Sequence, residues 1–160
     1  MRTPLTRHGA RARRPLVTLT TLSVLAAGLV VTGSAAAAPA YAAACTGKKG
    51  VTVVVDFTTL GGKVKTACDP TDPATGLAAL TGAGFTYSFV PHYPGFVCRI
   101  NWKPKPCNGA PATAYWSYWH AKPGGTWVYS TLGAASYNPA PGTVQGWAFG
   151  AGTAPSIPPP

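Results

Sequence analysis

The chain has 160 residues, and its 13 lysines and arginines against 3 acidic residues give a net charge of +10. Charged residues make up only 10% of the chain, whereas 19 glycines and 17 prolines interrupt it throughout. This composition excludes a coiled coil or a long helical bundle, because the charged helix formers are scarce. It indicates one small domain that is rich in turns.

The first 42 residues are organised as a secretory signal peptide. Five arginines precede an apolar run from Leu16 to Val31, and small residues then lead to Ala40-Tyr41-Ala42. The run is short of the roughly 20 residues that span a membrane, and an Ala-x-Ala cleavage signal follows it. We therefore predict cleavage near Ala42 and an exported mature chain without a transmembrane anchor.

Removal of the signal peptide changes the meaning of the net charge. The remaining chain has eight basic residues against three acidic ones, a net charge of +5, and no basic run is longer than two residues. A nucleic-acid-binding protein would concentrate its cations in a patch or stripe. We expect no nucleic-acid partner, although a weak attraction to an anionic cell wall or membrane surface is compatible with this charge.

Four cysteines, all in the predicted mature chain, indicate two disulfides, because an even number is typical of small exported domains. Of the three possible connectivities, Cys45–Cys68 and Cys98–Cys107 fit the predicted elements best. A zinc site is not expected, since the cysteine and histidine spacings of such sites do not occur. Lipidation of Cys45 is a less favoured alternative, because the three preceding alanines make a poor lipid-attachment motif.

The predicted elements begin with an antiparallel pair of strands. The β-branched segment Val51–Phe57 places Val51, Val53, Val55 and Phe57 on one face. A turn at Gly61-Gly62 leads to a return strand over Lys63–Cys68. Asp56 points away from the valine face and is expected to be solvated.

A short helix is predicted from Pro73 to Thr81. Asp72 suits the N-cap, and proline is tolerated at the first helical position because its missing N–H has no helical partner there. Asp69 and Asp72 are both expected to have turn or capping roles. Gly82 and Gly84 are expected to end the helix.

Four strands are predicted after the helix. They cover residues 96–101, 115–120, 126–130 and 144–149, and loops rich in glycine and proline separate them. In the first of these strands, Phe96, Cys98 and Ile100 are expected to point inward. The residues after Gly150, which end in three prolines, are predicted to be disordered.

The predicted order is β-β-α-β-β-β-β, which indicates an α+β fold of the β-grasp type. We expect a mixed, disulfide-stapled sheet over residues 43–150 with the short helix on one face. Because one helix covers only one face, the opposite face is expected to meet solvent, a partner or a ligand.

Several short segments together resemble the transcobalamin-like C-terminal β-domain, as found in small secreted actinobacterial proteins. These segments are Thr75–Leu80, Gly95–Asn101, Tyr115–Trp119, Tyr137-x-x-x-Pro141-Gly142 and Gly146-Trp147-x-Phe149. The resemblance implies a β-grasp-like, non-catalytic domain that closes over one face of a corrinoid such as cobalamin. It also implies a connection with membrane vitamin-uptake systems.

Aromatic residues on the last three strands are the candidate ligand-binding residues. By alternation, Trp116, Tyr118 and His120 share one face of their strand, and Tyr115, Ser117 and Trp119 share the other. Both sets could serve packing alone, since aromatic side chains bury much area in a small sheet. Alternatively, one set forms a platform for a planar or apolar ligand or a sugar. The candidate residues are Tyr115, Trp116, Tyr118, Trp119, His120 and Trp127.

We therefore expect a secreted, non-enzymatic ligand-binding or accessory module, with corrinoid or vitamin-type uptake implied by the resemblance alone. The alternative is a structural or cell-wall interaction protein whose aromatic face binds glycan or a protein partner. No cofactor is expected. Catalysis is disfavoured because only three acids remain, without glutamate, and the cysteines are expected to be paired.

The predicted disulfides can be tested by intact mass of the secreted protein. Alkylation without reductant should add no label, and alkylation after reduction should label all four cysteines. Labelling of four thiols without reductant would contradict the assignment.

Overall fold

The computed structural model describes residues 43–160, so the predicted signal peptide lies outside the described residues. Two short helical segments occur in this range, the 3-10 turn η1 (Thr58–Leu60) and the helix α1 (Gly76–Gly82). The strands are β1 (Val51–Asp56), β2 (Val64–Asp69), β3 (Tyr87–Val90), β4 (Tyr93–Ile100), β5 (Tyr115–Ala121), β6 (Val128–Tyr129) and β7 (Val144–Gly150).

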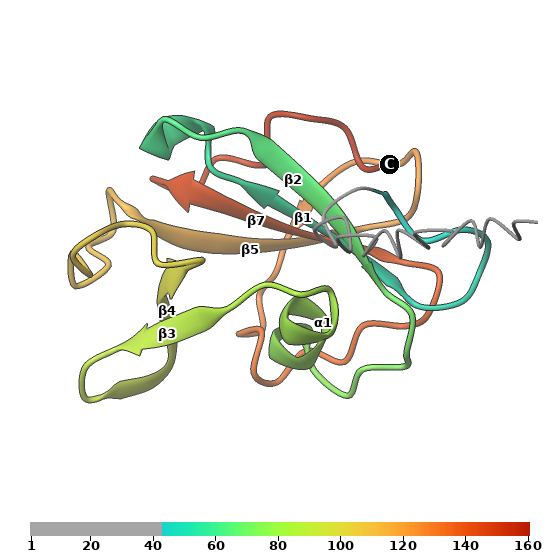
Figure 1. Cartoon of the computed structure of the whole chain (residues 1–160), viewed down its shortest axis with the longest axis horizontal. Helices are drawn as coiled ribbons and strands as arrows, with labels where there is room; N and C mark the ends of the chain where they lie inside the picture. The colour runs from blue at the N-terminus through green and yellow to red at the C-terminus, as the bar shows by residue number, and fades with distance from the viewer. Residues whose placement is uncertain (1–42) are drawn as a thin grey trace, which may run out of the picture. The chain divides into compact units, whose positions relative to one another are not determined.

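Five of these strands form one mixed sheet in the order β2-β1-β7-β5-β6 (Figure 1). β1 and β7 are parallel neighbours, and the other pairings in this sheet are antiparallel. β3 and β4 form a separate antiparallel hairpin. The prediction of an α+β fold with a mixed sheet and one short helix is confirmed for the described residues. β3 was not predicted as a separate strand, and the predicted strand 126–130 is reduced to the two residues of β6.

The main core lies between the sheet and α1. Val51, Val53 and Val55 of β1 are fully buried there, as the alternation of β1 predicts, with Leu80 of α1 in the same cluster. Figure 1 shows α1 and the β3–β4 hairpin on the same side of the sheet. Aromatic residues of β5 and β7 complete this face.

The helix begins later than predicted. Thr75, not Asp72, is the N-cap: its backbone is extended and its hydroxyl accepts a 3.0 Å hydrogen bond from the Ala78 N–H. Asp72 is exposed. The predicted end is confirmed, since α1 stops at Gly82 and Gly84 has a φ of +85°.

The predicted inward orientation of Phe96 is wrong. Its side chain is 50% exposed, while Val97, Cys98 and Ile100 are buried. The pairing of β3 with β4 shifts register on both sides of Phe89. This irregularity interrupts the two-residue alternation from which the orientation of Phe96 was inferred.

The second face of the sheet is covered, although it was expected to meet solvent, a partner or a ligand. The segment that covers it is residues 151–160, which we call the tail and which were predicted to be disordered. The Ile157 carbonyl accepts a 2.7 Å hydrogen bond from Trp127 Nε1, and the Pro159 carbonyl accepts one of 2.9 Å from the Gly124 N–H. Pro155 is buried, and a Cβ added to Gly146 of β7 would lie 2.8 Å from both Pro155 Cγ and Trp127 Cζ3. In Figure 1 this tail runs on the opposite side of the sheet from α1.

Asp56 is buried rather than solvated, because the tail closes over it. One carboxylate oxygen accepts a 2.7 Å hydrogen bond from the Ser156 N–H, and the other accepts bonds from the backbone and hydroxyl of Thr58. Burial raises the pKa of Asp56, but the hydrogen bonds from Ser156 and Thr58 outweigh it and hold the pKa below 3.8. The ionised carboxylate therefore fastens the tail to the end of β1.

Both predicted disulfides are confirmed. Cys45–Cys68 ties the segment before β1 to β2, and Cys98–Cys107 closes the loop that follows β4. Each disulfide reduces the conformational entropy of the unfolded chain. This stabilises a small domain by about 2–4 kcal/mol per bridge.

Replacement of Asp56 should remove a pH-dependent part of the stability. We expect Asp56→Asn to lower the free energy of unfolding at pH 7 by about 1–3 kcal/mol, because a charge-assisted hydrogen bond to the tail is lost. The folded-state pKa is lowered, so this contribution is present above the unfolded-state pKa and is lost as the pH falls through the folded-state value. Urea unfolding of both proteins between pH 7 and 2.5 should therefore show the difference shrinking in acid.

Asp72→Asn is the matched control, since Asp72 is exposed. Equal losses of stability in the two variants, or a difference that persists unchanged in acid, would contradict the role of Asp56.

Candidate functional site

The six candidate aromatic residues are divided between the two faces of the sheet and its edge. Trp116 and Tyr118 point into the main core, as their alternation predicts, and are 5% and 7% exposed. Trp119 points to the opposite face, where its indole N–H donates a 2.9 Å hydrogen bond to Ser117 Oγ. The sequence allowed one of the two alternating sets of β5 to form an open, flat platform on the second face of the sheet. Neither set does so.

Trp116 lies at the centre of an aromatic cluster. Its ring packs edge-on against Phe57 and Phe149, with centroids 5.2 and 5.4 Å apart. Its indole N–H donates a 3.1 Å hydrogen bond to the Lys103 carbonyl, in the loop after β4. Trp116 therefore connects the sheet to that loop.

Tyr118 is held against the start of α1. Its ring packs on Trp147, with centroids 4.8 Å apart, and on Tyr137 at 5.8 Å. A Cβ added to Gly76 would lie within 2.3 Å of the Tyr118 hydroxyl, so only glycine allows this approach. Burial raises the pKa of the Tyr118 phenol well above its ordinary value of 10, and the neighbouring Tyr137 adds to this effect.

The remaining candidates lie near the surface. At the start of β5, Tyr115 Oη is 3.2 Å from Tyr129 Oη, and this hydrogen bond, more than burial, raises the pKa of Tyr115. The half-buried His120 stacks on Tyr137, with centroids 4.8 Å apart and planes 12° from parallel. Trp127 packs under the tail near Ile157.

A groove on the helix side of the sheet brings three of the candidates together with residues that were not predicted. It has a volume of about 300 Å³. Its floor includes Trp116, Tyr118 and Trp147 of β5 and β7. The walls come from β4, from the start of β5, and from β6 and the segment after it. They include Phe96, Val97, Tyr115, Tyr129 and residues 130–134. We call this feature the apolar groove.

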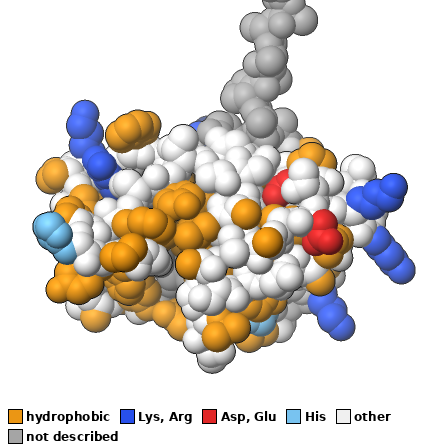
Figure 2. Space-filling model, turned by 90° about the horizontal axis from the view of Figure 1, so that it is seen from below, with side chains coloured by type: hydrophobic (Ala, Val, Ile, Leu, Met, Phe, Trp, Pro, Cys, Tyr) orange, Lys and Arg blue, Asp and Glu red, His pale blue; other side chains and the backbone are white. Residues whose placement is uncertain are grey.

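The rim of the apolar groove is unusually apolar for a surface. Phe96, Tyr129 and Leu132 are 50%, 45% and 54% exposed. Figure 2 shows hydrophobic side chains gathered over this side of the molecule, with the Lys and Arg side chains at its edges. Such a concave apolar surface suits an apolar or aromatic group of a ligand.

Polar chemistry inside the apolar groove is sparse. No acidic, basic or histidine side chain is among its lining residues within the described chain. Ser130 Oγ donates to the Leu132 carbonyl at 2.7 Å and so shapes the wall. Trp147 Nε1 is buried without a hydrogen-bond partner among the described residues. The groove can therefore bind apolar surface and offers at most a few orienting hydrogen bonds.

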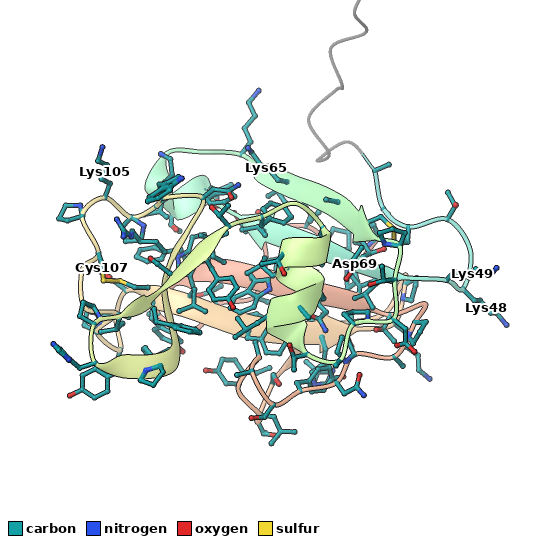
Figure 3. All side chains as sticks on the ribbon, turned by 60° about the horizontal axis from the view of Figure 1, so that its bottom comes forward. Lys48, Lys49, Lys65, Asp69, Lys105 and Cys107 are labelled. Carbon is teal, nitrogen blue, oxygen red and sulfur yellow. A yellow bond between two sulfur atoms is a disulfide. The ribbon has the colours of Figure 1, made fainter. Side chains whose placement is uncertain are left out.

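The two buried acidic residues, Asp56 and Asp69, accept hydrogen bonds from backbone N–H groups. Asp56 fastens the tail, and one oxygen of Asp69 accepts hydrogen bonds from the Thr71 N–H at 3.0 Å and the Thr71 hydroxyl at 2.7 Å. This confirms the predicted turn role of Asp69. The other oxygen of Asp69 lies against Gly82 of α1, where an added Cβ would come within 2.3 Å (Figure 3). Residues 43–160 contain no cluster of three or more histidine, cysteine or acidic side chains suited to a metal ion.

Comparison with known proteins identifies one region of similarity. A family model described as the SCO2322-like domain matches residues 108–157, from the loop before β5 to the tail that covers the sheet. No curated protein and no solved structure matches the chain. The match includes residues 151–157, which is most of the tail. The tail is therefore part of the matched domain, as its packing on the sheet also indicates.

The predicted resemblance to the transcobalamin-like C-terminal β-domain is wrong, because the matching family model is the SCO2322-like domain. Two of the five segments that carried the resemblance, Thr75–Leu80 and Gly95–Asn101, lie outside the matched residues. In the structure these segments are the start of a short helix and the end of a strand. Such features recur in many small α+β domains and do not identify a family.

The contact between α1 and Tyr118 can be tested with Gly76→Ala. Alanine is the better helix former, yet we expect a loss of about 1–3 kcal/mol, because the new methyl group overlaps the Tyr118 hydroxyl. Adding Tyr118→Phe removes that hydroxyl and should restore part of the stability. Chemical denaturation of the two single variants and the double variant measures the coupling. Additive effects would contradict this placement of Tyr118.

Proposed function

We propose that the mature chain is an extracellular, non-enzymatic binding module that holds an apolar group of its ligand in the apolar groove. The observation that carries this proposal is the concave aromatic floor of Trp116, Tyr118 and Trp147 beneath an exposed apolar rim. Monomeric proteins rarely expose such a surface without a binding role.

Two features support an extracellular location. The sequence of the first 42 residues has the signal-peptide pattern, and both pairs of cysteines are disulfide-bonded, as is usual in oxidising compartments. Within residues 43–160, no helix has the length and apolar character needed to cross a membrane.

The surroundings of the apolar groove support binding rather than catalysis. General acid–base chemistry needs a titratable side chain within hydrogen-bonding distance of the reacting group. The titratable side chains that line the groove are the tyrosines Tyr115, Tyr118 and Tyr129. Burial or hydrogen bonding raises the pKa values of Tyr115 and Tyr118, so both are neutral phenols at physiological pH.

The size of the apolar groove supports a compact apolar group rather than a large macrocycle. Its volume of about 300 Å³ is at the lower end of the range for small-molecule sites, which is ~300–1,000 Å³. The corrinoid expectation rested on the overturned resemblance and forms no part of the proposal.

A protein partner is a second candidate for the same side of the molecule. A second hollow of about 480 Å³ lies beside the rim, lined by the β3–β4 turn with Tyr93, Pro94 and Phe96. Tyr93 is 68% exposed. The apolar surface therefore continues beyond the groove, as a protein interface would require.

We further propose that the large sheet is of the β-grasp type. The parallel pair β1–β7 in its centre supports this assignment, together with the antiparallel neighbours β2 and β5 and the single helix α1 on one face.

Binding to the apolar groove can be tested with the uncharged fluorescent apolar probe N-phenyl-1-naphthylamine. We expect saturable, single-site binding to the natively folded mature protein. Gly133→Phe should reduce it at least about tenfold, because Gly133 lines the groove, has no positive φ, and has open space where a side chain would go. Leu132→Ser should weaken it by a smaller factor.

Val128→Ser is the matched control for Leu132→Ser, since Val128 is 50% exposed and does not line the groove. Probe binding that is absent, unsaturable or unchanged by Gly133→Phe would contradict the proposal. Titration with soluble peptidoglycan fragments separates the glycan alternative: tryptophan quenching by the fragments without probe binding would favour that alternative.

A further inference from the structure

An unusual turn, outside the apolar groove, follows β4. Asn101 and Trp102 both have positive φ, +47° and +66°, between residues that close a two-residue hairpin. Ile100 and Lys103 exchange backbone hydrogen bonds of 2.9 and 3.0 Å. This is the geometry of a type I′ turn, whose second central position normally holds glycine. A bulky residue such as tryptophan is disfavoured there.

The surrounding structure imposes this conformation on Trp102. Asn101 Oδ1 accepts a 2.9 Å hydrogen bond from the Thr86 N–H, and the Asn101 N–H donates to the Thr86 carbonyl at 2.9 Å. The Lys103 carbonyl is bonded to the Trp116 indole, and the Cys98–Cys107 disulfide closes the loop around the turn. A disfavoured residue held in a well-anchored turn points to a role for the side chain itself.

The Trp102 indole is exposed to solvent and borders a hollow. It is 68% exposed. On one side, the Arg99 guanidinium carbon lies 5.5 Å from the ring centroid, and Arg99 Nε donates a 3.0 Å hydrogen bond to Ser88 Oγ. The hollow that Trp102 borders has a volume of about 480 Å³ and is lined by Leu60, Asn101, Trp102, Lys103, Pro104 and Lys105. The indole thus lies beside one cation and borders an open space with two lysines.

The charge around this hollow has one sign. Arg99, Lys103 and Lys105 fall within seven residues of sequence, whereas the three acids of the described chain are at positions 56, 69 and 72. Asp56 and Asp69 are buried and hydrogen-bonded to backbone groups. The hollow is therefore complementary to a negatively charged ligand.

We propose that Trp102, Lys103 and Lys105 form a binding site, the Trp102 site, for a sugar ring that carries a carboxylate or phosphate group. The C–H groups on one face of a sugar ring have partial positive charge and pack on the electron-rich face of an indole. The two lysines bind the anionic substituent. The site lies outside the apolar groove and gives a secreted protein a means of attachment to acidic polysaccharide.

The geometry favours an anionic sugar over two other anionic partners. A membrane-binding surface would expose several apolar side chains together, but Trp102 lies beside the cationic residues Arg99, Lys103 and Lys105 and borders a hollow. Single-stranded nucleic acid is bound by successive aromatic platforms along a basic groove, whereas the Trp102 site has one platform.

Calorimetric titration of the mature protein with hexagalacturonate tests the proposal, with a phosphorylated mannose oligomer as the second anionic sugar. We expect binding to at least one of them, at least about tenfold tighter than to a neutral galactose oligomer of equal length. The arm that binds identifies carboxylate or phosphate as the recognised group. Trp102→Gly should weaken this binding at least about tenfold while the melting temperature stays unchanged or rises, because glycine suits the turn.

Lys103→Gln with Lys105→Gln should also weaken binding and reduce its dependence on salt. Two controls should bind like the parent protein: Tyr93→Ala, since Tyr93 is also 68% exposed, and Lys48→Gln with Lys49→Gln. Figure 3 places Lys48 and Lys49 at the opposite end of the molecule from Lys105.

Three results would overturn the proposal. The first is no binding to either anionic sugar, and the second is unchanged binding by Trp102→Gly. The third is equal or tighter binding to polyglutamate, an oligonucleotide or vesicles of anionic phospholipid. That result would show that the basic residues bind an anionic partner other than an acidic polysaccharide. Binding of the apolar probe to the Trp102→Gly variant tests the apolar groove independently. Failure of the Trp102 site can therefore be distinguished from failure of the apolar groove.

Discussion

The structure depends on the burial of β1 on both of its faces. All six residues of β1 are buried, between the antiparallel neighbour β2 and the parallel neighbour β7. An apolar strand of this kind is stable only when a layer packs on each side of the sheet. α1 and the β3–β4 hairpin provide one layer, and the tail provides the other. Gly146 lets that second layer come close, and Asp56 fastens its position at the end of β1.

Much of the fold could be predicted because its signals are local. Alternating β-branched and aromatic residues predicted the strands that became β1, β5 and β7, and glycines marked the turns. The tail could not be predicted in this way, since a proline-rich segment has no periodicity. Its order comes from hydrogen bonds to Asp56 and Trp127, which lie 100 and 30 positions earlier. The start of α1 was missed because Asp72 and Thr75 are both suitable caps, and tertiary packing selects between them.

The candidate site was predictable only in part. Alternation along β5 correctly assigned Trp116 and Tyr118 to one face, but it gives no information about what covers that face. The opposite wall of the apolar groove comes from Leu132 and its neighbours, in a loop with no recognisable pattern. Similarly, the sequence Asn101-Trp102 does not reveal that both residues have positive φ. That conformation is imposed by contacts with Thr86 and Trp116, which are distant in the chain.

The parallel pairing of β1 with β7 also has a consequence for when the protein can fold. The first strand of the sheet needs a partner that is synthesised about 90 residues later, after which the tail must still pack. Contacts between such distant parts of a chain form slowly. The sheet cannot close while residues 144–157 are still in the ribosome. A nascent chain of this design therefore stays open during most of its synthesis and closes its sheet only near the end.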